Sequence, residues 1–179
     1  MKTITLTPDQ MLARWRAIRL LDTSDASGLI AEQPSAIDLI LKAEIDAWYR
    51  NYLMTAPASL CPVADISATV MRGGSTVQYE LILPVNTIRV CRLRLSSWHR
   101  DAAIIVDPAP DRKALQTSPF TAAGVHNPIA FHEGLSLYPY PGRGDVETLE
   151  VIIHDTSSYT FAEGALADVK PISDLITLS

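Results

Sequence analysis

Ile88-Arg89-Val90-Cys91-Arg92-Leu93-Arg94-Leu95 alternates apolar and polar side chains along most of its length. A period of two residues is typical of a β-strand that buries one face. The alternation changes register near Cys91, because Val90 and Leu93 lie three positions apart rather than two or four. One extra residue at such a point indicates a β-bulge. The stretch therefore predicts a bulged strand.

Strand-like runs lie on both sides of this stretch. Upstream, Asp65–Met71 and Thr76–Leu83 are rich in β-branched residues, and the intervening Gly73-Gly74 supplies turn chemistry, so we expect a hairpin. Downstream we expect a buried strand at Ala102–Val106 and two further strands at Leu135–Tyr138 and Leu149–His154. Pro and Gly separate these runs, which is typical of an antiparallel β-sandwich or small barrel.

Two helices are expected before the strands. Thr7 and Gln10 occupy the reciprocal positions of a capping box, with Pro8 at the first helical position, and they predict a helix that ends near Leu21. The second helix, Ser35–Leu53, has the clearest pattern in the sequence. Its apolar residues recur at steps of three and four, as on one face of an amphipathic helix: Ile37, Leu41, Ile45, Trp48 and Tyr52.

The resulting fold class is α+β, with an N-terminal helical part of two amphipathic helices followed by an antiparallel β-sandwich or small barrel. The helical segment is expected over residues 1–60 and the β region over residues 61–179. A short C-terminal helix is expected at Phe161–Val169, followed by an extension. A chain of 179 residues without an interdomain linker is expected to form one compact domain.

Composition limits the classes of function. The net charge of −5 argues against a domain that wraps nucleic acid, which carries a basic stripe. Met1–Leu12 has no apolar core of a secretory signal, so we expect a cytoplasmic or virion-borne, soluble protein. No apolar run reaches the roughly 20 residues of a membrane span. Cys61 and Cys91 belong to no metal-binding spacing and are expected to be reduced.

Catalytic motifs are not found. The sequence has no phosphate-binding glycine loop and no nucleophile elbow, and we expect neither an enzyme nor a cofactor. His132-Glu133 and His154-Asp155 pair an imidazole with a carboxylate, but neighbouring side chains in a strand point to opposite faces. We therefore expect no metal site, although histidines gathered in a cleft remain an enzymatic alternative.

Two groups of residues are candidates for a contact surface. Arg89, Arg92, Arg94 and Arg100 form the densest basic cluster, either as a solvated strand face or as a surface for an acidic partner or nucleic acid. Tyr138 and Tyr140 are flanked by prolines and are expected to be exposed aromatic side chains. The tryptophans on the helix stripes are expected to be core residues instead.

A layout in the middle of the chain resembles the neck proteins of tailed bacteriophages. It comprises Leu83-Pro84 opening a basic strand, then Trp98, then Ser118-Pro119-Phe120, and finally Leu137-Tyr138-Pro139. Helices before such a β region are also similar to the tail tubular adaptor of short-tailed phages. The resemblance covers the middle of the chain, and the first 60 residues align with no motif of these proteins.

The resemblance implies a virion structural protein of the neck or tail, assembled in the host cytoplasm. Such a head-to-tail connector, or adaptor, forms a homo-oligomeric ring, twelve-fold in these adaptors, beneath the portal and around the DNA channel. Its partners are other copies of itself, the portal protein and the tail or next-ring proteins, and DNA passes without sequence-specific binding. Among the segments expected to reach a neighbour is the proline-rich loop Thr117–Pro128.

The alternative function is a β-sandwich binding module for carbohydrate or a protein partner. It would use Tyr138, Tyr140 and Trp98 as an aromatic platform on a monomer.

Overall fold

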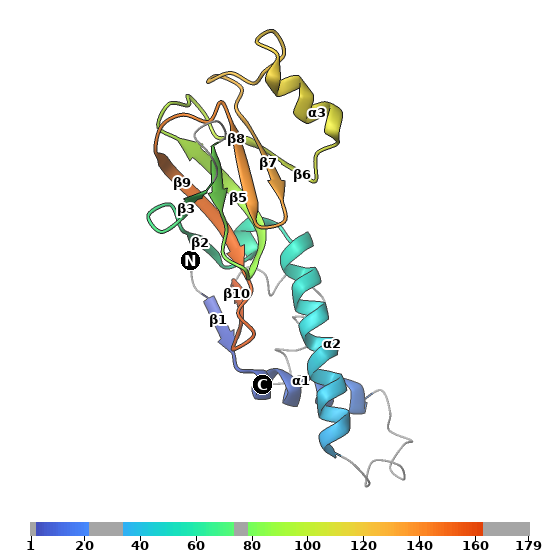
Figure 1. Cartoon of the computed structure of the whole chain (residues 1–179). Coiled ribbons are helices and arrows are strands. Elements are labelled where there is room, and N and C mark those ends of the chain that lie inside the picture. The colour runs from blue at the N-terminus through green and yellow to red at the C-terminus, as the bar shows by residue number, and fades with distance from the viewer. Residues whose placement is uncertain (1–2, 22–33, 74–78, 163–179) are drawn as a thin grey trace. The chain divides into compact units, whose positions relative to one another are not determined.

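The computed structural model describes residues 3–21, 34–73 and 79–162 (Figure 1). The chain divides into two compact units, and the first is built from both ends of the sequence. Unit 1 comprises residues 1–62 and 154–179, and unit 2 comprises residues 63–153.

Unit 1 combines a two-stranded sheet with helices. Strand β1 (Thr3–Leu6) pairs antiparallel with β10 (Tyr159–Ala162). The helices of this unit are α1 (Pro8–Leu21), α2 (Pro34–Thr55) and the 3-10 helix η1 (Ala58–Leu60). The predicted capping box is confirmed, because the Thr7 amide donates to Gln10 Oε1 at 2.9 Å and the Gln10 amide donates to Thr7 Oγ1 at 3.2 Å.

Helices α1 and α2 run antiparallel. Near the start of α1, Asp9 Oδ1 lies 3.3 Å from Lys42 Nζ, and further along α1 Arg16 pairs with Asp38, which is earlier in α2. The observed bounds of α1 and α2 lie close to those of the two helices predicted from the sequence.

Aromatic side chains form much of the core of unit 1, together with the fully buried Met11, Ile45 and Leu53. Rings from α2 and β10 contact one another at centroid distances of 5.0 to 6.3 Å, and they belong to Trp48, Tyr49, Tyr52, Tyr159 and Phe161. The Tyr49 hydroxyl donates to the Thr160 carbonyl at 2.7 Å and accepts from the Thr160 amide at 3.0 Å. These bonds join α2 to β10 and satisfy polar groups inside the unit.

Unit 2 contains two sheets. The smaller has the order β2-β9-β5 and is antiparallel, with β2 (Val63–Asp65), β5 (Thr87–Leu95) and β9 (Val146–Ile153). The register between β5 and β9 shifts between Val90 and Arg92, so the predicted bulge is confirmed.

The larger sheet has the order β3-β4-β8-β7-β6. Its strands are β3 (Met71–Gly73), β4 (Glu80–Ile82), β6 (Ala103–Val106), β7 (Ile129–Glu133) and β8 (Ser136–Tyr140). All neighbouring strands are antiparallel except β6 and β7, which are parallel. Parallel neighbours need a crossover, and the segment between them supplies it with helix α3 (Pro110–Ala114) and the 3-10 helix η2 (Leu115–Thr117). Figure 1 shows α3 on the side of β6 and β7, away from β3.

The core of unit 2 lies between the two sheets and is mainly aliphatic. Leu93 of β5, Leu81 of β4 and Leu149 of β9 have no exposed surface. Trp98 belongs to the same cluster, and its indole Nε1 donates to the Pro141 carbonyl at 3.0 Å. The two sheets therefore bury their facing sides against one another.

The predicted fold class is wrong. The chain is mostly β, with ten strands in three sheets among the described residues and 28% helix, and it has no long N-terminal helical part. Strand β1 precedes the helices and requires β10 from the other end of the chain as its partner. The β region is also not wholly antiparallel, because β6 and β7 run in the same direction.

Two local predictions also need correction. The C-terminal helix is wrong at its start, since Phe161 and Ala162 belong to β10, and the remainder of Phe161–Val169 lies outside the described residues. Strand β6 is a half-exposed edge strand rather than a buried one. Pro139 lies in the central strand β8, but beyond the last residue pair between β8 and β4, so it needs no ladder partner on that side.

Candidate interaction surfaces

The arginines of β5 are paired with carboxylates. Arg92 Nε lies 2.8 Å from Asp101 Oδ2, and Arg92 Nη1 lies 3.7 Å from Glu150 Oε1 on the neighbouring strand β9. Arg94 Nε lies 2.9 Å from Glu147 Oε2. The hydrogen bond to Asp101 raises the pKa of Arg92 above its usual range. Both arginines therefore have local counterions.

The other two arginines of the candidate cluster differ in exposure. Arg89 is half-buried on β5 beside Cys91, where burial raises the pKa of the thiol and the guanidinium opposes that shift. Arg100 is exposed in the turn after β5. Together the four arginines and the three carboxylates form a mixed-charge strip, defined as Arg89, Arg92, Arg94, Arg100, Asp101, Glu147 and Glu150.

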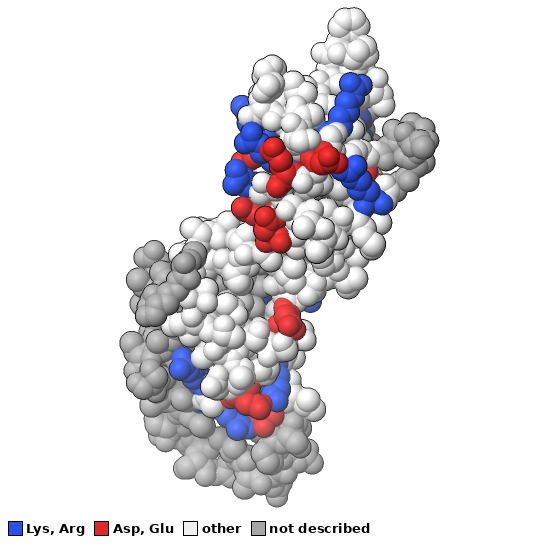
Figure 2. All heavy atoms as spheres, turned by 90° about the vertical axis from the view of Figure 1, so that its left-hand side faces the viewer, with Lys and Arg blue, Asp and Glu red and all other residues white. Residues whose placement is uncertain are grey.

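The mixed-charge strip is poorly suited to tight binding of DNA. A protein holds DNA by neutralising phosphates with cations that are free to do so. In the space-filling view, acidic and basic side chains lie side by side rather than in separate patches (Figure 2). The strip carries one net positive charge, so it offers little attraction for phosphate.

Tyr138 and Tyr140 are half-buried side chains on one face of β8. The Tyr138 hydroxyl donates to Glu80 Oε1 at 3.1 Å, and Ser136 Oγ donates to the same oxygen at 2.6 Å. The Tyr140 ring packs against Phe131 with 5.2 Å between centroids. Both tyrosines are thus engaged within the larger sheet rather than fully exposed.

The aromatic platform expected for a binding module lacks its third member. Trp98 is 3% exposed and lies in the core, so it presents no face to a sugar ring. No observation on the described residues favours the carbohydrate-binding alternative over the connector.

The histidines are not gathered in one cleft. His99 and His126 stack on each other with 4.4 Å between centroids, whereas His132 lies on β7. His154 is buried in unit 1 and its Nε2 lies 2.7 Å from Asp46 Oδ1. Within residues 3–21, 34–73 and 79–162, no three His, Cys, Asp or Glu side chains are grouped to hold a metal ion.

No helix in the described part of the chain is both long and apolar enough to cross a membrane.

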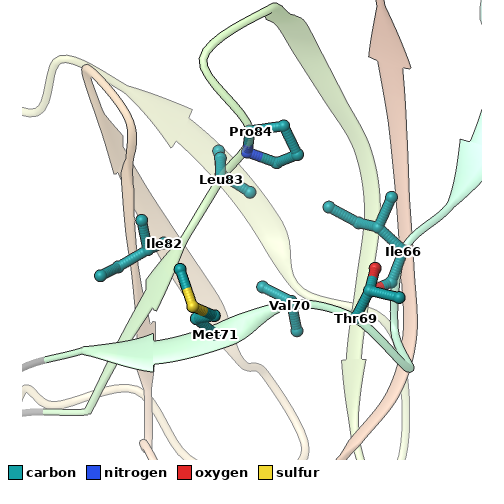
Figure 3. A pocket seen from close by; sticks show the side chains of 7 residues that line it. All are labelled: Ile66, Thr69, Val70, Met71, Ile82, Leu83 and Pro84. Carbon is teal, nitrogen blue, oxygen red and sulfur yellow. The ribbon is translucent and has the colours of Figure 1, made fainter.

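An apolar hollow lies at the β3–β4 edge of the larger sheet. Its volume is about 140 Å³, and Figure 3 shows its side chains arranged around a common space: Ile66, Thr69, Val70, Met71, Ile82, Leu83 and Pro84. Met71 and Ile82 are 67% and 38% exposed. Sequence reasoning missed this hollow because its two segments meet only through the pairing of β3 with β4.

Phe120 is the most exposed large apolar side chain among the described residues, at 96%. It follows η2 in the crossover between β6 and β7, within the loop expected to reach a neighbour. The sequence signal was Ser118-Pro119-Phe120, an aromatic residue in a turn-forming context, but only exposure in the fold separates it from a core phenylalanine.

Comparison with known proteins gives no family assignment. No protein-family model matches the chain, and no curated protein matches it.

Proposed function

We propose that this chain is a structural virion protein, a head-to-tail connector subunit that forms a ring beneath the portal of a tailed bacteriophage. The observation that carries the proposal is the exposure of large apolar side chains at both edges of the five-stranded sheet. At one edge these are Met71 of β3 and Ile82 of the adjacent strand β4. At the other edge Val106 of β6 is 61% exposed, and Phe120 lies in the crossover that connects β6 to β7.

Two different apolar edges on one unit suit a heterologous contact between copies. In such a contact one patch fits a different patch on the neighbour, and a ring results where the rotation closes. A contact that uses the same patch on both copies would end at a dimer. The β3 and β6 edges are different surfaces, so repetition of their contact generates a ring or a helical filament.

The mixed-charge strip supports a role beside DNA without tight binding. Arg92 and Arg94 are matched by Asp101, Glu147 and Glu150. A connector must let DNA move through its channel, and few unpaired cations means few phosphate contacts to break. We infer a mechanical role with no reaction and no cofactor.

The test joins genetics with assembly. The genes beside this one are sequenced, and the portal protein encoded there is purified and mixed with the full chain. We expect terminase, portal and capsid genes nearby, and electron microscopy should show rings of this chain, twelve-fold by the resemblance, on the portal. A chain that remains monomeric both alone and with that portal, or a locus without a portal gene, contradicts the proposal.

A further inference from the structure

The exposed position of Phe120 is fixed by hydrogen bonds around it. The Thr121 hydroxyl donates to the Leu115 carbonyl at 2.7 Å, and the Ala122 amide donates to the Ser118 carbonyl at 2.9 Å. The Ala123 amide donates to Gln116 Oε1 at 2.8 Å. An apolar side chain held outward by an ordered turn loses little conformational entropy on binding, which favours it as an anchor.

The apolar hollow matches a phenyl ring in size and chemistry. A dry cavity of about 150 Å³ lined by aliphatic side chains admits benzene, and this hollow has a volume of about 140 Å³. Six of its seven lining residues are apolar, and the seventh, Thr69, donates its hydroxyl to the Ile66 carbonyl at 3.3 Å. The hollow therefore offers apolar contact to an aromatic ring.

Phe120 does not fill the hollow of its own chain, because it is not among the residues that line it. The hollow lies at β3 and β4, whereas Phe120 belongs to the crossover between β6 and β7. Strands about 4.8 Å apart separate the two edges by about 19 Å. A contact between Phe120 and such a hollow therefore requires two copies of the chain.

We propose that Phe120 of one copy inserts into the apolar hollow of the neighbouring copy. The pairing rests on the proposed ring function and deepens it, because it names the two patches of the heterologous contact and gives the ring a direction. Each subunit presents Phe120 to one neighbour and the hollow to the other, so every hollow in a closed ring is filled.

The test uses two variants of the full chain, alone and mixed. Phe120→Ala removes the anchor and leaves the hollow, whereas Met71→Glu places a carboxylate at the rim and leaves the anchor. Each variant alone should self-associate at least roughly tenfold more weakly than wild type, as for a central aromatic anchor. Phe120→Leu and Met71→Leu are the matched controls and should retain assembly.

Mixing the two variants tests whether Phe120 and the hollow are partners of each other. Phe120 of the Met71→Glu chain still fits the hollow of the Phe120→Ala chain, but that pair offers no second working contact. Native mass spectrometry of the equimolar mixture should therefore show a dimer of the two variants and no ring.

The remaining outcomes separate the pairing from the ring. If wild type forms rings and Phe120→Ala forms them equally well, the pairing is wrong and the proposed function stands. If Phe120→Ala forms rings but no longer binds the portal, the partner of Phe120 is the portal and the pairing is again wrong. If wild type forms no ring alone or with the portal, both proposals fail.

Discussion

The two units of this chain fill their cores by different chemical means. In unit 1, aromatic rings of α2 meet β10, and the Tyr49 hydroxyl is bonded on both sides to Thr160. In unit 2, aliphatic side chains of two facing sheets pack together, and among the described residues of that cluster Trp98 is the one fully buried aromatic side chain. The comparison indicates that unit 1 depends on buried hydroxyl groups, whereas unit 2 depends on packed volume.

The largest expected effect is in the aliphatic core. Leu93→Ala removes a side chain with no exposed surface and leaves a cavity, which should lower the free energy of unfolding by about 2–5 kcal/mol. Hydrogen exchange followed by mass spectrometry should show the loss in peptides from residues 63–153. Leu93→Met, which conserves volume, is the control and should cost less than about 1.5 kcal/mol. If Leu93→Met lowered the free energy of unfolding as much as Leu93→Ala, lost packing would not be the cause.

A smaller effect is expected from one oxygen atom in unit 1. Tyr49→Phe preserves the ring but leaves the Thr160 amide and carbonyl without this partner, which should cost about 1–3 kcal/mol. The matched control is Tyr138→Phe in unit 2, whose hydroxyl bonds Glu80 at the sheet surface. Urea unfolding followed by tryptophan fluorescence measures both. If Tyr138→Phe lowers the free energy of unfolding as much as Tyr49→Phe does, buried hydroxyl groups do not distinguish unit 1 from unit 2.

Alkaline pH should separate the units further. Burial raises the pKa of Tyr49 and of Tyr52 to about 12 from 10.0. The unfolded state therefore loses these protons first, and the stability from the neutral hydroxyls, complete below pH 10, declines as the pH rises toward about 12. Urea midpoints measured across this range should fall more steeply for wild type than for Tyr49→Phe. If the urea midpoints of wild type and Tyr49→Phe fall equally with pH, ionisation of Tyr49 is not the cause of the loss of stability.

Local signals in the sequence predicted helices α1 and α2 and strand β5 of unit 2. The capping box of Thr7 and Gln10 operates within four residues, and the bulge near Cys91 is visible in the alternation of β5 alone. Strands β1 and β10 were missed because each has four residues and needs a partner from the opposite end of the chain. Their pairing replaces the predicted helical part with a mixed unit.

The candidate interaction surfaces were predicted only in part, because they also depend on pairing between strands that are distant in the sequence. The positions of the arginines on β5 follow from the sequence, but their carboxylate partners follow from pairing: Arg92 faces Glu150 only in the register of β5 with β9. The hollow likewise requires β3 to pair with β4. Local patterns specify which residues lie on a strand, whereas tertiary register decides what those residues meet.

The smallest effect should come from the mixed-charge strip, which belongs to neither core. The side chains of Arg94 and Glu147 are 36% and 51% exposed, and ion pairs of this kind contribute at most about 1 kcal/mol and weaken with salt. Arg94→Ala should therefore leave both units nearly as stable as in wild type, as measured by urea unfolding at low and high salt. The exchange Arg94→Glu with Glu147→Arg should restore whatever is lost. If Arg94→Ala lowered the free energy of unfolding as much as Leu93→Ala, the mixed-charge strip would be part of the packing of unit 2. The distinction between a stabilising core and a solvated charged face would then be wrong.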